Sequence, residues 1–423
     1  MRLLLSPPPP GASPGPGRLL TRPPGSAQAV LRVRDMLESV RRRAALAGAL
    51  LLAGLGGLGL VGWRKYGGDP WADSVIAPAD AFNLRGPVPG AGPGFALALW
   101  QTVGVRMEPG HEVRWIDNGE VFPAIVAGVR AARTSVHIDM YIWEEGEASN
   151  QLSEALMERA RAGVACRIVV DDLGSPKFLE RAGKRLVEAG CEVRVFRPLP
   201  DGAKFGRNHR KIVVVDGKVA FTGGFGVRDN WLGDGVTHDK WRDASARFTG
   251  PAVAEAQQAF AENWQEAGGH LLPDDAFPTP APSDGPRAAV ISSSASPYVT
   301  RAERLTQLMI SAARRRLWIS NAYFVPSQAI RALLAQKADE GVDVRVLTAG
   351  KKSDSKTSFG LQQGVYGSLG QHGVRFFEYQ PSMLHSKTML VDDNLSLIGS
   401  INLDPLSLNS LEDVALVVDD QPL

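Results

Sequence analysis

The sequence predicts a mixed α/β fold of two similar lobes, each a mixed β-sheet flanked by helices, related by a pseudo-two-fold and preceded by a transmembrane helix. Three observations support this prediction. Helix-like and apolar strand-like segments alternate along most of the 423 residues, a polar motif occurs twice, and an uncharged run lies near the N-terminus. With 44% hydrophobic residues, the chain can bury the cores of two or three domains.

The N-terminal region divides into two parts. Residues 1–35 are rich in Pro, Gly and Ser, so we expect them to be disordered. Residues 36–66 are expected to form a membrane anchor helix, because 44–63 carries no charge and is long enough to span a bilayer. A buried helix and a cleaved signal peptide are the alternatives. More arginines precede the run than follow it, which predicts a single-pass inner-membrane protein with its catalytic part on the outer (periplasmic) side.

The rest of the chain is predicted to contain two lobes and two linkers. Residues 67–95 are a linker rich in Pro and Gly, 96–269 form the first lobe, 270–287 link the lobes, and 288–423 form the second lobe. The sequence shows no counterpart in the second lobe of the helix predicted at 252–266. We therefore expect the second lobe to lack its C-terminal helix.

The predicted elements follow the same order in both lobes. In the first lobe they are helix 121–133, strand 136–143, helix 152–162, strand 165–171, helix 178–188 and strand 192–196. In the second lobe they are helix 301–315, strand 317–324, helix 329–339, strand 343–348, helix 360–369 and strand 374–379. Such alternation indicates α/β lobes around a largely parallel or mixed sheet.

A polar motif follows the last of these strands in each lobe. The first copy has the spacing H-x-K-x-x-x-x-D and comprises His209, Lys211 and Asp216, with a Gly-Gly pair seven residues after the Asp. The second copy comprises His385, Lys387 and Asp392. Here a Gly-Ser pair follows at the same distance. Two copies at one spacing indicate a repeated catalytic unit.

Each motif also has the pattern of a buried strand and a turn. Residues 212–215 and 388–391 are continuous apolar runs, as strands buried on both faces require. Each His and Lys would therefore lie at one end of a central strand, and Asp216 and Asp392 at the hairpin turn that follows. We interpret these two aspartates as structural before catalytic. Two facing lobes would bring both His-Lys pairs into one cleft.

The motifs and several flanking strings resemble the phospholipase D superfamily, and within it the bacterial cardiolipin synthase branch. The strings that support the resemblance are HIDMYIW (137–143), DDLGS (171–175), NHRKIVVVDGKVAFTGG (208–224), WRDASARFTGPAV (241–253), NAYFVP (321–326), LHSKTMLVDD (384–393) and GSINLDPLSL (399–408). The resemblance implies two phospholipase D-like lobes and an enzyme that needs no metal or other cofactor and forms a covalent phosphohistidine.

The resemblance also implies roles for the repeated residues. His209 would attack phosphorus, and His385 would protonate the leaving alcohol and then activate the incoming one. Lys211 and Lys387 would neutralise the phosphate.

Carboxylates and small residues complete the expected site. Asp243 and Glu412, each following the His of its own half, are the positions expected to orient the two imidazoles. Residues expected at the phosphate are Gly223, Gly224, Ser400 and Asn402.

One position departs from the family pattern. Gly226 stands where the family usually has Asn, and a polar donor missing at the phosphate would cost on the order of 100-fold in rate. Asn230 or a backbone N–H of the glycine-rich loop is the expected replacement.

The leading hypothesis is a phosphatidyl transferase that acts on a phosphatidylglycerol-like phospholipid in a membrane. A phospholipase D-type hydrolase, a nucleic-acid phosphodiesterase and a degenerate scaffold are the alternatives. A net charge of +2 gives no support for a nucleic-acid partner. The two cysteines, Cys166 and Cys191, lie in strand-like runs and are expected to be buried small hydrophobes rather than a disulfide.

Overall fold

The computed structural model describes residues 84, 86–199, 206–281, 283–296 and 298–420. The chain divides into the units Met1–Gly67 and Gly68–Leu423, and every described residue belongs to the second unit. The predicted disordered segment and membrane helix therefore lie outside the described residues. Within the described ranges, no helix combines the length and apolar character that crossing a bilayer requires.

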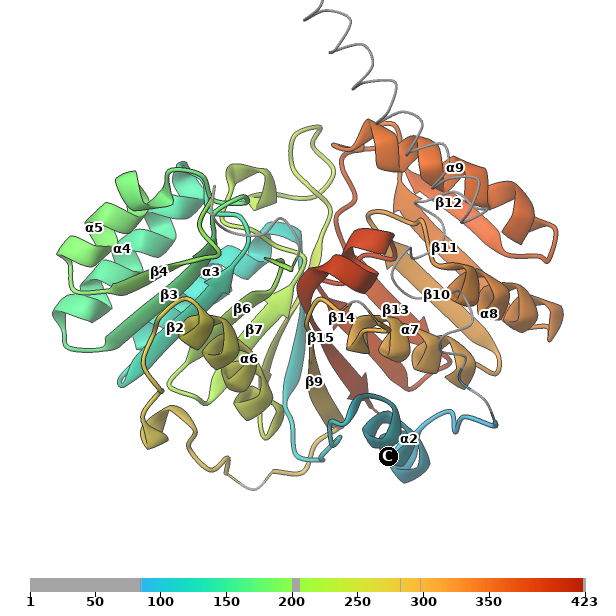
Figure 1. The fold of residues 1–423 in the computed structure, drawn as a ribbon, viewed down its shortest axis with the longest axis horizontal. Coiled ribbons are helices and arrows are strands. Elements are labelled where there is room, and N and C mark those ends of the chain that lie inside the picture. Colours follow the sequence, from blue (N-terminus) through green and yellow to red (C-terminus); the bar gives the residue numbers. More distant parts are fainter. Residues whose placement is uncertain (1–83, 85, 200–205, 282, 297, 421–423) are drawn as a thin grey trace, which may run out of the picture. The chain divides into compact units, whose positions relative to one another are not determined.

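Seven strands of the described chain form the first sheet, in the order β1-β8-β7-β6-β2-β3-β4. Figure 1 labels β7, β6, β2, β3 and β4 of this sheet. The strands are β1 (Val113–Asp117), β2 (Ser135–Met140), β3 (Ala165–Asp171), β4 (Glu192–Phe196), β6 (Lys211–Val215), β7 (Val219–Gly223) and β8 (Ala244–Thr249). β2, β3 and β4 are parallel, and the remaining neighbours are antiparallel. The sheet is mixed, as predicted.

Helices cover both faces of this sheet. One face packs against α3 (Val121–Ala131), α4 (Glu147–Arg161) and α5 (Ala182–Glu188) in a shared apolar core. The other face receives α6 (Ala252–Glu266), where Phe260 stacks on the ring of His137 at 4.9 Å.

The second sheet repeats this plan. Its order in the described chain is β12-β11-β10-β13-β14-β15-β5, and β9 also pairs with β15. The strands are β5 (Arg207–Asn208), β9 (Arg287–Ser293), β10 (Arg316–Asn321), β11 (Asp343–Ala349), β12 (Arg375–Tyr379), β13 (Lys387–Val391), β14 (Leu395–Gly399) and β15 (Leu411–Asp419). α7 (Arg301–Ala312), α8 (Gln328–Asp339) and α9 (Lys356–Gly370) pack on one face. The short helical turns among the described residues are η1 (Asn118–Glu120), η2 (Phe178–Glu180), η3 (Asp229–Trp231), η4 (Asp274–Ala276) and the π-helical η5 (Leu406–Ser410).

The two sheets are joined by a third apolar cluster. Ile212 and Val214 of β6 lie in one cluster with Val414 and Leu416 of β15. The predicted repeat of helices and strands is confirmed, because every predicted element of both lobes is present within a few residues of its expected bounds. The α/β fold with two mixed sheets is therefore confirmed for the described residues.

The predicted first-lobe boundary is wrong at its N-terminal end. Helix α2 (Gly92–Val103) begins inside the predicted linker, and its residues Phe95, Leu99 and Val103 lie in the apolar core of the second sheet. The reason is contact with α7, which offers the apolar face that α2 requires. Residues 96–103 thus precede the first lobe in sequence but pack with the second.

The expected burial of both motif strands holds for only one of them. β6 is buried throughout, whereas Leu390 of β13 is 46% exposed. In the first sheet α6 covers the corresponding face, and within the described part of the chain no helix follows β15 to cover this one. The prediction of two-sided burial for 388–391 is therefore wrong.

The cysteines are buried as expected, but the expectation that they form no disulfide is wrong. Cys166 at the start of β3 and Cys191 just before β4 form a disulfide. Because β3 and β4 are parallel neighbours, the start of one strand and the residue preceding the other come close together in space. Spacing in sequence did not reveal this contact.

Candidate active site

Both H-x-K motifs lie at the beginning of a central strand, one in each sheet. Lys211 begins β6 and Lys387 begins β13, and each ammonium donates to the carbonyl oxygen of the His two residues earlier. His209 is 7% exposed and His385 is 5% exposed. The motif side chains are thus held in a nearly enclosed position.

Each imidazole is paired with a carboxylate from the other half of the chain. His209 Nδ1 lies 2.8 Å from Asp413 Oδ1, and His385 Nδ1 lies 3.1 Å from Asp243 Oδ2. The backbone repeats the crossing, because His209 N–H donates to the Glu412 carbonyl at 2.8 Å and His385 N–H donates to the Arg242 carbonyl at 2.7 Å. The crossing brings both motifs into one site.

The expected pairing of carboxylates is therefore wrong in two respects. Asp243 contacts His385, not the His of its own half. Glu412 contacts neither imidazole, since its carboxylate accepts from Arg210 at 3.0 Å, and Asp413 takes the expected role. Neighbouring residues of a strand point to opposite faces of the sheet. The prediction is wrong by one residue in β15, so it names a side chain on the face away from His209.

The two carboxylates receive different second donors. The Ser400 hydroxyl donates to Asp413 Oδ1 at 2.5 Å. The equivalent residue in the first half is Gly224, and here the Trp231 indole N–H donates to Asp243 Oδ2 at 2.7 Å. A Cβ on Gly224 would lie 2.3 Å from Asp243 Oδ1, so the carboxylate occupies the space that a side chain would need.

These contacts change the expected role of the small residues. A Cβ on Gly223 would lie 2.6 Å from the Ala244 carbonyl oxygen, so this glycine allows two strands to approach closely. Ser400 uses its N–H on the Val414 carbonyl at 2.8 Å and its hydroxyl on Asp413. Gly223 and Gly224 therefore allow the backbone and the Asp243 carboxylate to approach closely, and Ser400 holds the Asp413 carboxylate, whereas the phosphate contact of these residues stays a prediction. Asn402 is 3% exposed and its Oδ1 has no hydrogen-bond partner in the described structure.

Gly226 is enclosed by apolar groups. A Cβ at this position would lie 3.1 Å from Ile142 Cβ and 3.1 Å from an atom of the Trp231 ring, so a side chain here would require these neighbours to shift by a few tenths of an ångström. The Asn230 amide, one of the expected replacements, donates to the Asp239 carbonyl at 3.0 Å. Trp231 fills the space and donates to the carboxylate instead.

Asp216 and Asp392 lie at the opposite ends of their strands, in the hairpin turns. Both have left-handed backbone conformations, with φ of 54° and 52°. The Asp216 carboxylate accepts backbone N–H bonds from residues 133–135, and the Asp392 carboxylate from residues 314–316. Although burial opposes it, these bonds lower the pKa of Asp216. Asp216 thus anchors the loop that leads into β2, and Asp392 anchors the loop that leads into β10. These contacts agree with a structural role.

Burial determines the protonation of the central groups. Burial, with the added charge of Lys211, lowers the pKa of His209 to about 4. Burial also lowers the pKa of Lys211 to about 7 and that of Lys387 to about 8, although nearby aspartates oppose the change. The charge of Lys387 contributes to the lowering at His209, which agrees with both motifs sharing one site.

Aromatic rings surround the two imidazoles, a feature that motif spacing did not predict. Tyr141 meets His209 edge-on at 5.1 Å, and Tyr323 meets His385 edge-on at 6.3 Å. Trp231 and Trp241 add two more rings at 5.1 and 5.2 Å from His385. Within the described ranges, no group of three or more His, Cys, Asp or Glu side chains is arranged to hold a metal ion.

The fold and the crossed histidine pairs define a phospholipase D-like protein with one composite site. The sequence profile described as "Cardiolipin synthase, PLD-like domain" matches residues 125–264 and 307–423. The chain therefore belongs to the cardiolipin synthase, PLD-like family of enzymes.

Individual relatives agree with this membership. Cardiolipin synthase A of Pseudomonas fluorescens is 36% identical over 318 residues, which cover 74% of this chain and 66% of that protein. Cardiolipin synthase A of Pseudomonas aeruginosa is 32% identical over 364 residues, which cover 85% of this chain and 71% of that protein. The crystal structure of phosphatidylserine synthase from Haemophilus influenzae shares the fold, with a TM-score of 0.58 at 12% identity over 77% of this chain and 86% of that one.

Proposed function

We propose that the protein is a phosphatidyl transferase of the cardiolipin synthase type. In this proposal one phosphatidylglycerol gives its phosphatidyl group to the enzyme, and a second phosphatidylglycerol takes it, releasing glycerol in the first step and cardiolipin in the second. The observation that supports it most strongly is the crossed pairing of His209 with Asp413 and of His385 with Asp243. That pairing gives one site two oriented imidazoles.

In the first step His209 Nε2 attacks phosphorus. Its Nδ1–H donates to Asp413, which leaves the lone pair on Nε2 and stabilises the charge that develops on the ring. The P–N bond forms as the bond from phosphorus to the glycerol oxygen breaks, and His385 gives that oxygen a proton. A phosphohistidine and free glycerol result.

In the second step the acceptor reverses these transfers. A hydroxyl of the second phosphatidylglycerol gives its proton to His385, and its oxygen attacks phosphorus while the P–N bond breaks. His385 suits both directions because its Nδ1–H donates to Asp243 at 3.1 Å, so the ring stays oriented while Nε2 gives up a proton and takes one back.

Lys211 and Lys387 supply the positive charge that the transferred phosphate needs. Both ammonium groups are buried, and burial strengthens their attraction to an oxyanion. We propose that these two lysines serve in place of a metal or cofactor. The low pKa of His209, about 4, keeps the attacking imidazole neutral near pH 7.

A lipid-product assay tests the proposal. Purified full-length protein is incubated with vesicles of phosphatidylglycerol, and we expect cardiolipin and glycerol to appear in equal amounts. Phosphatidic acid in place of cardiolipin would indicate the hydrolase, in which water resolves the phosphohistidine. No product from phosphatidylglycerol would contradict the proposed substrate, and no phosphodiester turnover of any kind would favour the non-catalytic scaffold.

We further propose an inner-membrane location with the catalytic part on the periplasmic side. Two features support it: the excess of arginines before the uncharged run 44–63, and the disulfide between Cys166 and Cys191. Disulfides persist in oxidising compartments such as the periplasm. Protease added to intact spheroplasts is expected to digest the catalytic part, whereas protection until lysis would contradict this orientation.

A further inference from the structure

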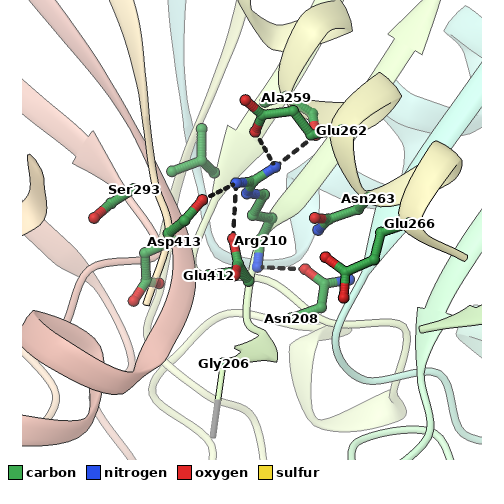
Figure 2. Close-up of polar contacts among 12 residues, drawn as sticks. Gly206, Asn208, Arg210, Ala259, Glu262, Asn263, Glu266, Ser293, Glu412 and Asp413 are labelled. Atoms are coloured by element: carbon green, nitrogen blue, oxygen red, sulfur yellow. Dashed lines mark hydrogen bonds and ion pairs between the residues drawn. The ribbon is translucent and has the colours of Figure 1, made fainter. Parts of the chain in front are cut away.

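Arg210, the residue between the catalytic His and Lys of the first motif, is a buried cation for which the proposed reaction has no use. Its side chain is fully buried, with 0% exposed. The guanidinium donates to the Ala259 carbonyl at 2.6 Å and pairs with Glu262 and Glu412, each at 3.0 Å. Figure 2 shows the guanidinium at the centre of these three groups.

The partners of Arg210 come from the helix that packs on the first sheet and from a strand of the second sheet. Ala259 and Glu262 lie on α6, which packs on the first sheet, whereas Glu412 lies on β15 of the second sheet. Next to this contact, β5 pairs with β15, and His209 N–H donates to the Glu412 carbonyl at 2.8 Å. Arg210 therefore joins α6 to the point where β15 meets the first motif.

Glu412 and Asp413 are consecutive in β15 and point to opposite sides of it. One binds Arg210 and the other binds His209. A shift of β15 that separates Glu412 from Arg210 would also move Asp413 relative to the His209 ring.

Within the described residues, the residue between His and Lys of the second motif makes no equivalent salt bridge. Ser386 occupies the equivalent position, and its hydroxyl lies 2.6 Å from the hydroxyl of Ser320. Ser320 lies in β10 and Ser386 immediately precedes β13, so both sides of this contact belong to the second lobe and it joins nothing across the two sheets.

We propose that Arg210 is a positioning residue that, through Glu412, holds β15 in the register that keeps Asp413 on the His209 ring. The inference rests on the proposed function, because it assigns a purpose to the orientation of His209. It also gives Glu412 a role different from that of an imidazole partner.

A double-mutant cycle tests the proposal. Arg210→Met and Asp413→Asn are made singly and together in the full chain, and turnover of phosphatidylglycerol and of bis(4-nitrophenyl) phosphate is measured. We expect Arg210→Met to lower kcat on the order of 100-fold with KM changed by less than about 3-fold, because a displacement of about 1 Å at a reacting group has that effect. In the Asp413→Asn background the same change is expected to cost less than about 3-fold.

The matched control is Ser386→Ala, which alters the same position of the second motif and is expected to change turnover by less than about 3-fold. Arg210→Lys is expected to recover part of the loss, since an ammonium keeps the charge but cannot contact all three partners as the planar guanidinium does. If Arg210→Met does not fold, Glu412→Gln takes its place in the cycle.

Equal losses from Arg210→Met in both backgrounds, or a loss below about 2-fold in the wild-type background, would overturn the proposal. Failure of the proposed function is distinct, because the wild type would then turn over neither phosphodiester. Turnover of bis(4-nitrophenyl) phosphate but not of phosphatidylglycerol would contradict only the lipid substrate, and the double-mutant cycle would still be measured with bis(4-nitrophenyl) phosphate.

Discussion

The two halves of the site have the same plan but differ in how each carboxylate is held. Asp413, which orients His209, receives a hydroxyl donor from Ser400. Asp243, which orients His385, receives an indole donor from Trp231, and Gly224 stands where the serine would be. The indole of Trp231 and the hydroxyl of Ser400 each give a buried carboxylate a second hydrogen bond. The same hydrogen bond can therefore come from different residue types in the two halves.

The halves also differ around the imidazoles. Next to His209, Arg210 pairs with Glu412 of the other sheet, whereas His385 lies against the rings of Trp231 and Trp241. These differences agree with unequal roles for the two histidines. Substitutions that remove these differing residues, or exchange them between the halves, therefore test whether His209 is the nucleophile and His385 the acid and base.

The largest effect is expected from the two carboxylates. Asp413→Asn and Asp243→Asn should each lower turnover about 10³-fold or more, because an amide favours the wrong tautomer of the imidazole. With bis(4-nitrophenyl) phosphate, whose leaving group needs no proton, Asp243→Asn should still release about one 4-nitrophenolate per enzyme in a burst. Asp413→Asn should show no burst. Equal bursts in both variants would contradict the unequal roles.

Exchanging the small residues between halves should have the next largest effect. Gly224→Ser puts a Cβ 2.3 Å from Asp243 Oδ1, so the carboxylate must move away from its position beside His385. We expect this displacement to lower kcat about 100-fold. Ser400→Gly removes one hydrogen bond to Asp413 and should cost about 10-fold, since a hydrogen bond to a charged group contributes about 1.5–3 kcal/mol. Steady-state kinetics on both variants give the comparison. A larger loss from Ser400→Gly would contradict the packing argument.

Trp231→Phe isolates the indole donor. The ring remains against His385, but Asp243 loses its N–H partner, and turnover should fall about 10-fold. Trp241→Phe, which changes the other tryptophan beside His385, should cost less than about 3-fold, because its contact with His385 is one of ring packing. Similar losses in the two variants would show that ring packing, not the hydrogen bond, is what Trp231 provides.

The lysines should produce the smallest difference, a displacement of the alkaline limb of the pH profile. Each ammonium must be charged to neutralise phosphate, and the lowered pKa values mean that this charge is lost as the pH rises through about 7 at Lys211 and about 8 at Lys387. The wild-type kcat/KM should therefore fall above about pH 7. Lys211→Arg should move that limb toward pH 8, whereas Lys387→Arg should leave it near pH 7. If the alkaline limb moved in neither variant, titration of the lysines would be excluded as the cause of the limb.

Much of the fold could be predicted because the signals are local. The apolar runs of β3 and β4 are short, bounded by turn residues and matched in the second lobe, and the structure gives Ala165–Asp171 and Glu192–Phe196 as expected. The motif turns also follow from the sequence, since Asp216 and Asp392 occupy left-handed positions that Asp tolerates.

The parts that could not be predicted depend on contacts between distant segments. Which carboxylate meets which imidazole depends on the packing of one sheet against the other, and the choice between Glu412 and Asp413 depends on the face that β15 presents. The docking of α2 on the second core and the Cys166–Cys191 disulfide are contacts of the same kind. No local pattern encodes them.

Trapping the covalent intermediate tests the central claim most directly. The full-length enzyme is mixed with phosphatidylglycerol labelled at phosphorus, quenched in alkali to preserve phosphohistidine, digested, and the labelled peptide is sequenced by mass spectrometry. We predict that the label lies on His209, is absent from His209→Ala and persists in His385→Ala. Label on His385, or label retained by His209→Ala, would contradict the account and reverse the roles of the two halves.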